Sequence, residues 1–298
     1  MKVLISGANG MIGSALTQAL EARGDTVHRL VRGAKARGGD VRWSPLEGTI
    51  DDAALVGHDA VVHLAGEPIA GRWTSNKRSA IHESRVLGTE LLTSALARIP
   101  TRPDVLVCAS AAGFYGDGKQ AELTEESPQG RGFLAQVVKD WEAAAEPALA
   151  AGIRTVHLRA GMVLSPRGGA LQQLMLPFRM GVGGRVGSGR QYWAWIGLHE
   201  LVGLFLRALD DSSMRGVYNA VAPQQTTNRE FTRTFGKVLG RPTFLPAPAA
   251  ALRLALGDLA DEMLLASQRV VPQRLTASHH DWQDADLEAT LRREIAAG

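Results

Sequence analysis

Cysteine is almost absent from this sequence: Cys108 is the only one among 298 residues. A single thiol excludes an internal disulfide, and its place inside the apolar run 105–109 favours a buried structural thiol over a nucleophile. No apolar stretch reaches the roughly 18 residues of a membrane span, and a glycine turn at Gly7 replaces the apolar core of a signal peptide. We therefore expect a chain that works in a reducing cytoplasm.

Excess charge is also scarce, because 33 Lys and Arg face 30 Asp and Glu, a formal net charge of +3. No basic run or aromatic-interleaved basic patch occurs, so nucleic acid is not an expected partner. The lack of a spanning segment means that a membrane is not an expected partner either. The histidines lack the spacing of metal ligands, since His279 and His280 are adjacent without nearby partners. We expect a small-molecule substrate and no metal, with a homodimer as the assembly to test.

Glycine, in contrast, is plentiful, and three glycines stand three residues apart directly after the apolar run 3–5. An apolar-periodic segment follows as far as Leu20, which predicts a strand, a glycine turn and a helix. Such a turn lets the backbone approach a pyrophosphate at a helix N-terminus, although a purely structural turn is the alternative. The predicted cofactor-binding residues of this loop are Gly7, Asn9, Gly10, Met11, Ile12 and Gly13.

The next predicted strand, 26–31, is followed directly by a basic residue, Arg32. No Asp or Glu lies between residues 26 and 39, where an NAD enzyme usually places a ribose-binding carboxylate. A guanidinium can instead hold a 2′-phosphate in a bidentate, charge-assisted pair. We therefore predict NADP (NADPH) as the cofactor, with Arg32 as its main contact and a solvated basic loop as the alternative. The basic residues concerned are Arg29, Arg32, Lys35 and Arg37.

Further apolar runs at 60–64, 105–109 and 155–158 are nearly continuous, as expected of strands buried on both faces. The segments 74–99 and 133–149 have the length and period of helices, and Asn228 is predicted to cap another that ends at Gly240. Alternating strands and helices predict an α/β fold, a Rossmann-like doubly wound parallel sheet.

Short motifs in a fixed order extend this pattern along nearly the whole chain. They are residues 7–13, 63–66, 72–73, 84–85, 113–116, 140–142, 168–171 and 267–272. Together they resemble the epimerase family protein group of NAD-dependent epimerase/dehydratase-like proteins, a branch of the extended short-chain dehydrogenases/reductases. The resemblance implies an NADP-binding Rossmann domain over 1–240, with substrate-side insertions at about 165–200. It also implies a small, mostly helical C-terminal substrate domain over 241–298, a domain of unknown function in that group.

By the same resemblance, two further segments contact the cofactor. The first is expected on its adenosine-to-ribose side and comprises Leu64, Ala65 and Gly66. The second, Gly161 and Met162, is expected near the nicotinamide.

The resemblance fails at the catalytic residues. Extended relatives use a Tyr-x-x-x-Lys pair, in which the lysine holds the nicotinamide ribose and lowers the tyrosine pKa. Lys139 is retained here, but the position four residues before it is Ala135, which has no titratable proton. Ala111 and Arg85 occupy the positions of the usual Ser or Thr and Asn.

Four other side chains are candidates for the missing chemistry. Tyr115 follows a strand at the ligand-binding edge and is the leading proton donor, with a structural, hydrogen-bonded hydroxyl as the alternative. Ser110 could bond a substrate carbonyl, and Arg85 could clamp an anion or form a surface ion pair. Glu67 could act as a base if it is desolvated. No spacing chooses among them.

These observations predict an NADP(H)-binding, atypical short-chain dehydrogenase or epimerase-like protein. We interpret it as an oxidoreductase acting on an unidentified carbonyl or sugar-like substrate. A non-catalytic NADP(H)-binding sensor or regulatory protein is the alternative, supported by the incomplete catalytic set. Ala135 argues against an ordinary nucleotide-sugar epimerase.

Overall fold

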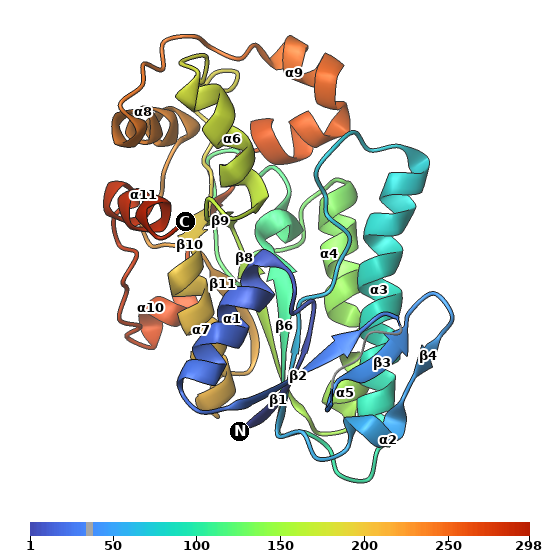
Figure 1. The fold of residues 1–298 in the computed structure, drawn as a ribbon. Coiled ribbons are helices and arrows are strands. Elements are labelled where there is room, and N and C mark those ends of the chain that lie inside the picture. Colours follow the sequence, from blue (N-terminus) through green and yellow to red (C-terminus); the bar gives the residue numbers. More distant parts are fainter. Residues whose placement is uncertain (34–37) are drawn as a thin grey trace.

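The structure is a computed structural model that describes residues 1–33 and 38–298, and a parallel sheet forms its centre (Figure 1). The strands of this sheet are β1 (Lys2–Ser6), β2 (Thr26–Val31), β3 (Val41–Ser44), β4 (Thr49–Ile50), β5 (Ala60–His63), β6 (Val105–Ala111), β8 (Arg154–Ala160) and β11 (Gly216–Ala220). Their order is β11-β8-β6-β5-β1-β2-β3-β4, and β4 alone pairs antiparallel. The order reverses between β1 and β5, which makes the sheet doubly wound and Rossmann-like, as predicted.

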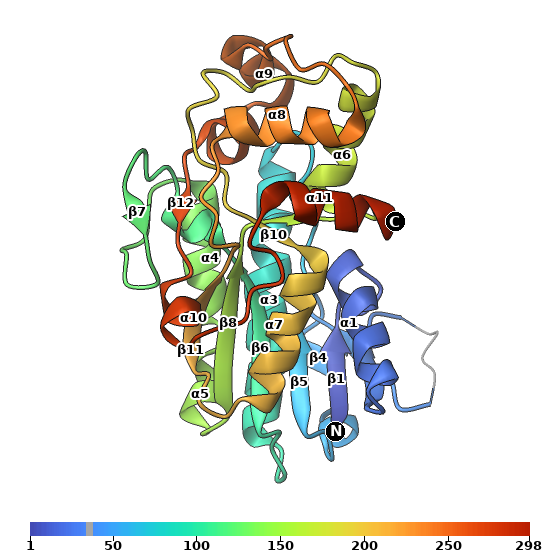
Figure 2. The same ribbon diagram turned by 90° about the vertical axis from the view of Figure 1, so that its left-hand side faces the viewer.

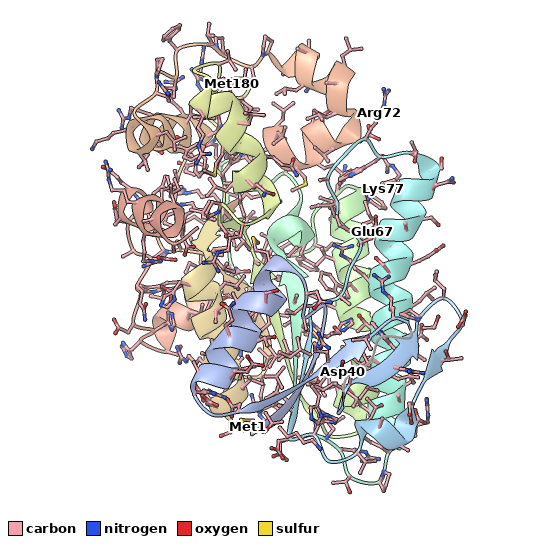
Figure 3. The ribbon with its side chains drawn as sticks, viewed as in Figure 1. Met1, Asp40, Glu67, Arg72, Lys77 and Met180 are labelled. Atoms are coloured by element: carbon pink, nitrogen blue, oxygen red, sulfur yellow. The ribbon has the colours of Figure 1, made fainter. Side chains whose placement is uncertain are left out.

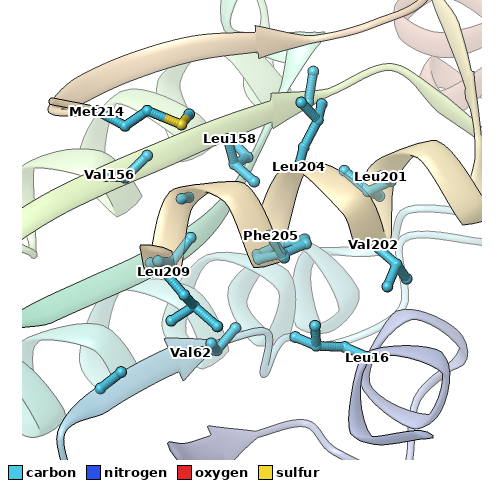
Figure 4. Close-up of a cluster of buried hydrophobic side chains, with 14 of the residues drawn as sticks. Leu16, Val62, Val156, Leu158, Leu201, Val202, Leu204, Phe205, Leu209 and Met214 are labelled. Atoms are coloured by element: carbon cyan, nitrogen blue, oxygen red, sulfur yellow. The ribbon is translucent and has the colours of Figure 1, made fainter. Parts of the chain in front are cut away.

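Helices cover both faces of the sheet. One face carries α1 (Met11–Ala22) and α7 (Leu198–Asp210), and the other carries α3 (Ser75–Arg98), α4 (Phe133–Ala143) and α5 (Glu146–Ala150) (Figures 1 and 2). The short helix α2 (Asp52–Leu55) precedes β5. Figure 4 shows Leu16 of α1 and Phe205 of α7 in the buried cluster over Val62 and Leu158. The predicted helix over 133–149 is two helices. Pro147 has no backbone N–H with which to continue α4, and it lies in the first turn of α5, where a proline is tolerated.

A second lobe lies beyond the carboxyl ends of the strands (Figure 2). Its elements are β9 (Met162–Leu164), α6 (Gly169–Arg179), β10 (Trp195–Gly197), α8 (Asn228–Leu239), α9 (Ala249–Leu256), η2 (Ala260–Leu265) and α11 (Leu287–Ala296). One apolar core joins Phe178 and Phe231 to Leu265 and Leu291, so it draws on both sides of residue 240. The N-cap of α8 is Thr227 rather than the predicted Asn228, because Thr227 and Glu230 form a capping box.

The end of the chain returns from this lobe to the sheet. The short strand β12 (Arg269–Val270) pairs with β7 (Glu122–Leu123), and α10 (Gln273–Ala277) contacts β11. Buried Glu200 fastens the next segment by accepting hydrogen bonds from the backbone N–H groups of Gln283 (2.7 Å) and Asp284 (2.8 Å). The two lobes are therefore joined at several points around the edge where ligands of such sheets bind.

Candidate functional site

The glycine loop between β1 and α1 has a backbone that side chains would obstruct. An ideal Cβ on Gly13 would stand 2.3 Å from the Gly7 carbonyl oxygen, and Gly7 itself has φ +69°. Gly10 donates its N–H to the Gly7 oxygen (2.9 Å) and precedes the first turn of α1 as its N-cap. Asn9 and Gly10 are exposed, while Met11 and Ile12 are half-buried. The N-terminus of α1 thus opens to solvent behind a close-packed turn, which suits a phosphate group.

A buried polar chain ties this loop to residues 64–66. The Ser6 hydroxyl oxygen accepts the N–H groups of Leu64 (3.0 Å) and Ala65 (3.2 Å). His63 contacts the Ser6 oxygen through Nδ1 (2.7 Å) and the Thr89 oxygen through Nε2 (2.9 Å). The predicted segment Leu64–Gly66 is therefore held beside the glycine loop, at the point where the strand order reverses.

We expect acid to destabilise the fold through His63. Burial, with a smaller effect of His157, lowers the pKa of the His63 imidazole to about 4. The unfolded chain therefore binds a proton in a range where the folded chain does not, and stability falls as the pH drops below about 6.5. The loss should reach about 2 kcal/mol by about pH 5. Urea unfolding above about pH 6.5 and at about pH 5 measures this loss of stability. The variant His63→Asn should remove most of the pH dependence. An unchanged pH dependence in His63→Asn would contradict the assignment to His63.

The structure describes two of the basic residues in and after β2, and their surroundings differ. Arg29 pairs with Asp40 at 2.6 Å, an acid that lies one residue beyond the acid-free stretch. Arg32 is exposed and, within residues 1–33 and 38–298, forms no ion pair. Lys35 and Arg37 lie outside the described residues. Of the two described residues, Arg32 is the one available for a 2′-phosphate, as predicted.

The loop after β5 contains Glu67 and is contacted by Arg85 of α3. Arg85 lies against Gly66, where an ideal Cβ would meet its guanidinium carbon at 3.2 Å, and donates to the Glu67 carbonyl oxygen at 3.0 Å. It stacks over Trp141 at 5.1 Å, and burial lowers the Arg85 pKa to about 10. The Glu67 carboxylate pairs with Lys77 at 2.7 Å, and its side chain is 40% exposed (Figure 3). Glu67 is therefore paired and partly exposed in this structure, and its role as a base stays a prediction.

Tyr115 and Ser110 belong to a buried polar network. The Tyr115 hydroxyl donates to Asn219 (2.7 Å) and accepts from Arg159 (2.9 Å). Arg159 also pairs with Glu142 at 2.7 Å, and Ser110 donates to that same carboxylate at 2.5 Å. Tyr115 is 2% exposed, and burial raises its pKa despite the opposing charge of Arg159. This geometry agrees with the alternative of a structural, hydrogen-bonded hydroxyl, and the role of Tyr115 as proton donor stays a prediction.

The charges of this network balance. Burial alone would raise the pKa of Glu142, but the hydrogen bonds and the charge of Arg159 outweigh it and hold the pKa below its usual value. Arg159 also stacks on Phe114, with its guanidinium carbon 3.5 Å from the ring centre. The sequence prediction missed this network, although one signal was local: the charged residue Arg159 directly follows the predicted strand 155–158.

The face of α4 that looks toward the sheet edge is apolar. An ideal Cβ on Gly113, which follows β6 in the short helix η1 (Ala112–Tyr115), would meet Leu134 at 3.5 Å and Val138 at 3.9 Å. These two residues are four apart, as a Tyr-x-x-x-Lys pair would be. Lys139 is exposed, one position beyond that face. Its ribose-holding role stays a prediction without support from this geometry.

Gly161 and Met162 lie where the two lobes meet. A Cβ on Gly161 would stand 2.7 Å from the Ala194 carbonyl carbon, and the Met162 N–H donates to the Ala194 oxygen at 2.8 Å. Met162 then begins β9, which pairs with β10. The predicted nicotinamide-side segment is therefore fixed by backbone contacts, and its role toward the cofactor stays a prediction.

A pocket of about 330 Å³ opens between this edge and the second lobe. Its floor is Gly113 and Leu134, and its far wall is η2. The Glu262 carboxylate of η2 accepts the N–H groups of Phe133 (2.9 Å) and Leu134 (2.7 Å), so it caps α4. The volume is at the lower end of the range for small-molecule sites. The lining residues are Gly113, Gly116, Asp117, Arg131, Leu134, Arg253, Asp261, Glu262, Leu265 and Ala266.

Within the part of the chain that the structure describes, no group of three or more His, Cys, Asp and Glu side chains is arranged to hold a metal. Among the same residues, no helix is long and apolar enough to cross a membrane.

Two regions of the chain match known protein families. Residues 3–220 match the model of the NAD dependent epimerase/dehydratase family, and residues 247–294 match a domain of unknown function, DUF1731. The chain belongs to the NAD-dependent epimerase/dehydratase family. This membership confirms the resemblance that the short motifs indicated.

Relatives of this family align with the chain from end to end. An epimerase family protein of Mycobacterium tuberculosis is 43% identical over 284 residues, covering 94% of each chain. The human epimerase family protein SDR39U1 is 38% identical over 300 residues, covering 99% of this chain and 100% of its own.

Solved structures extend the similarity to three dimensions. A crystal structure of human SDR39U1 with NADPH matches with a TM-score of 0.90 and 37% identity over 99% of both chains. A nucleoside-diphosphate sugar epimerase of Corynebacterium glutamicum matches with a TM-score of 0.83 and 36% identity, and the match spans 58% of that longer chain.

Proposed function

We propose that this protein binds NADP(H) and works as an oxidoreductase or epimerase-like enzyme on a small carbonyl or sugar-like molecule. The observation that carries the proposal is the backbone cradle at Gly7–Gly13 beside the available Arg32. Both fit the cofactor, because the open N-terminus of α1 suits a pyrophosphate and Arg32 suits a 2′-phosphate. The NADPH bound by the human relative supports the same cofactor here.

The chain's own residues would divide the remaining work. Leu64–Gly66, held by Ser6, would line the adenosine-to-ribose side, and Gly161 with Met162 would face the nicotinamide. The pocket under Glu262 would orient the substrate beside Gly113. The bound cofactor supplies the hydride, so the protein must supply orientation and a proton path. Since Tyr115 is enclosed, that path would use a water or an ionisable group of the pocket.

The apolar face of α4 also favours a second candidate, a non-catalytic NADP(H) sensor. Leu134 and Val138 can donate no proton to a substrate. The two candidates share the cofactor site and differ in turnover. NADPH oxidation followed across a panel of aldehydes, ketones and nucleotide sugars separates them, because only the enzyme consumes NADPH.

The buried thiol is consistent with a reducing compartment, and we propose the cytoplasm. Burial, with a smaller effect of Glu142, raises the pKa of Cys108 to about 12, which leaves the thiol protonated and unreactive.

Replacing Arg32 tests the cofactor assignment. Arg32→Ala should weaken NADPH binding by roughly 10- to 100-fold and leave NADH binding nearly unchanged, because only NADPH carries the 2′-phosphate. Fluorescence titration of both cofactors measures the two affinities. Arg215→Ala, which removes an exposed arginine elsewhere, is the matched control and should change neither affinity. Equal losses for both cofactors in Arg32→Ala would refute the assignment.

A further inference from the structure

Basic residues are concentrated in two segments of the second lobe. Segments 166–190 and 226–253, which contain α6, α8 and α9, hold nine Lys and Arg against one acid, Glu230. The rest of the chain holds 24 basic and 29 acidic residues. The single acid is also engaged, because the Glu230 carboxylate closes the capping box with Thr227. These two segments are therefore strongly cationic in a chain whose net charge is only +3. Two of their basic residues pair with acids of η2 and α11, Arg253 with Asp261 and Lys237 with Glu288.

Large apolar side chains are exposed on the same lobe. Met180 is 67% exposed and Phe244 is 76% exposed, and Leu176, Val182 and Leu245 are exposed as well. We call these five residues the apolar patch. Figure 3 places Met180 at the end of the molecule remote from Met1.

The apolar patch is continuous because its two segments lie side by side. A Cβ on Gly181 would approach Pro242 at 4.0 Å, and one on Gly184 would overlap the Leu245 carbonyl group at 1.5 Å. Leu176 and Met180 are four residues apart at the end of α6, so they share one face. Exposed apolar groups gathered at one place mark an interaction surface.

Arginines border the apolar patch. Arg179 adjoins Met180, Arg241 adjoins Pro242, and the Arg185 carbonyl oxygen accepts the N–H of Ala247 at 2.8 Å, two residues beyond Leu245. Arg179 and Arg241 are exposed and form no ion pair with any residue in 1–33 or 38–298. Their positive charges are thus available to an anionic partner.

We propose that the apolar patch and its arginines dock the protein reversibly on an anionic lipid bilayer. Apolar side chains enter the boundary between headgroups and acyl chains, while neighbouring arginines stay with the anionic headgroups. Each basic residue near such a surface adds to the attraction. Our expectation of no membrane partner rested on the lack of a spanning segment, which a surface contact does not need.

Vesicle flotation tests this docking on the full chain. The protein should float with vesicles of phosphatidylcholine and phosphatidylglycerol in equal parts, and should stay behind with phosphatidylcholine alone. Met180→Ser/Phe244→Ser should weaken the binding roughly tenfold or more, through lost apolar burial. Arg179→Glu/Arg241→Glu should weaken it similarly, and added salt should weaken wild-type binding. NADPH titration of each variant confirms that it is folded.

A matched control uses the opposite end of the molecule. Leu149→Ser/Arg215→Glu removes one exposed apolar and one exposed basic side chain outside the second lobe, and should float as the wild type does. Absence of flotation, equal binding to both vesicle types, or equal losses in the control would overturn the proposal. A second copy of this chain is the other candidate to cover the apolar patch, and sedimentation without vesicles tests it. If the wild type is a dimer and Met180→Ser/Phe244→Ser is a monomer, the apolar patch is a dimer interface and the proposal is overturned.

Discussion

Gly10→Val is expected to abolish NADPH binding, by about a thousandfold or more, on the order of 4 kcal/mol, while the protein stays folded. Gly10 has φ −76°, which any residue adopts, and its ideal Cβ meets only the Gly7 oxygen, at 3.3 Å. The valine methyl groups would instead occupy the space before α1 where a pyrophosphate must approach the backbone. Fluorescence titration measures the affinity, and circular dichroism measures the fold.

Gly203→Val is the matched control, because a Cβ at this exposed position of α7 meets no atom of residues 1–33 or 38–298 within 4 Å. It should bind NADPH as the wild type does. Gly13→Val should damage the fold itself, since its Cβ would stand 2.3 Å from the Gly7 oxygen. Normal binding by Gly10→Val would mean that the loop is only structural.

Glu142→Ala should lower the free energy of unfolding by about 3–5 kcal/mol, the usual cost of leaving a buried charge without its partner. Arg159 would lose its carboxylate, at 2.7 Å, while its side chain remains 5% exposed. Urea denaturation measures the change. Tyr115→Phe removes one hydroxyl from the same network and should cost only about 1–2 kcal/mol.

Tyr115→Phe also tests the role of Tyr115, and Glu142→Ala tests whether Arg159 depends on its carboxylate. If turnover is found with a carbonyl substrate, Tyr115→Phe should retain it, because the hydroxyl is enclosed between Arg159 and Asn219. A loss of turnover of about a hundredfold without loss of stability would restore the catalytic role. Wild-type stability in Glu142→Ala would show that Arg159 does not depend on the carboxylate.

Local patterns predicted the sheet and the cofactor loop well. The runs at 3–5 and 105–109 became parts of β1 and β6, since a parallel strand buried on both faces must be apolar. The roles of Gly7 and Gly13 in the loop were predictable because a glycine turn between a strand and a helix has a local backbone cause. The break at Pro147 and the cap at Thr227 were missed, although both signals are local.

Long-range contacts were not predictable in the same way. Asp40 pairs with Arg29 and Arg159 joins Glu142 to Tyr115, and each pairing depends on which strands are neighbours. Glu262 caps α4 from a distant part of the chain, so no residue near 133 could indicate this cap. For the same reason, the sequence suggested that Tyr115 was available, and only the fold shows it enclosed.

Isothermal titration of NADPH and NADH into the unmodified protein asks directly whether this chain is built to hold NADP(H). We expect one saturable NADPH site per chain, with NADH bound roughly 10- to 100-fold more weakly because it offers Arg32 no 2′-phosphate to hold. A protein that binds no NADPH, or that binds NADH as tightly as NADPH, would contradict the cofactor assignment.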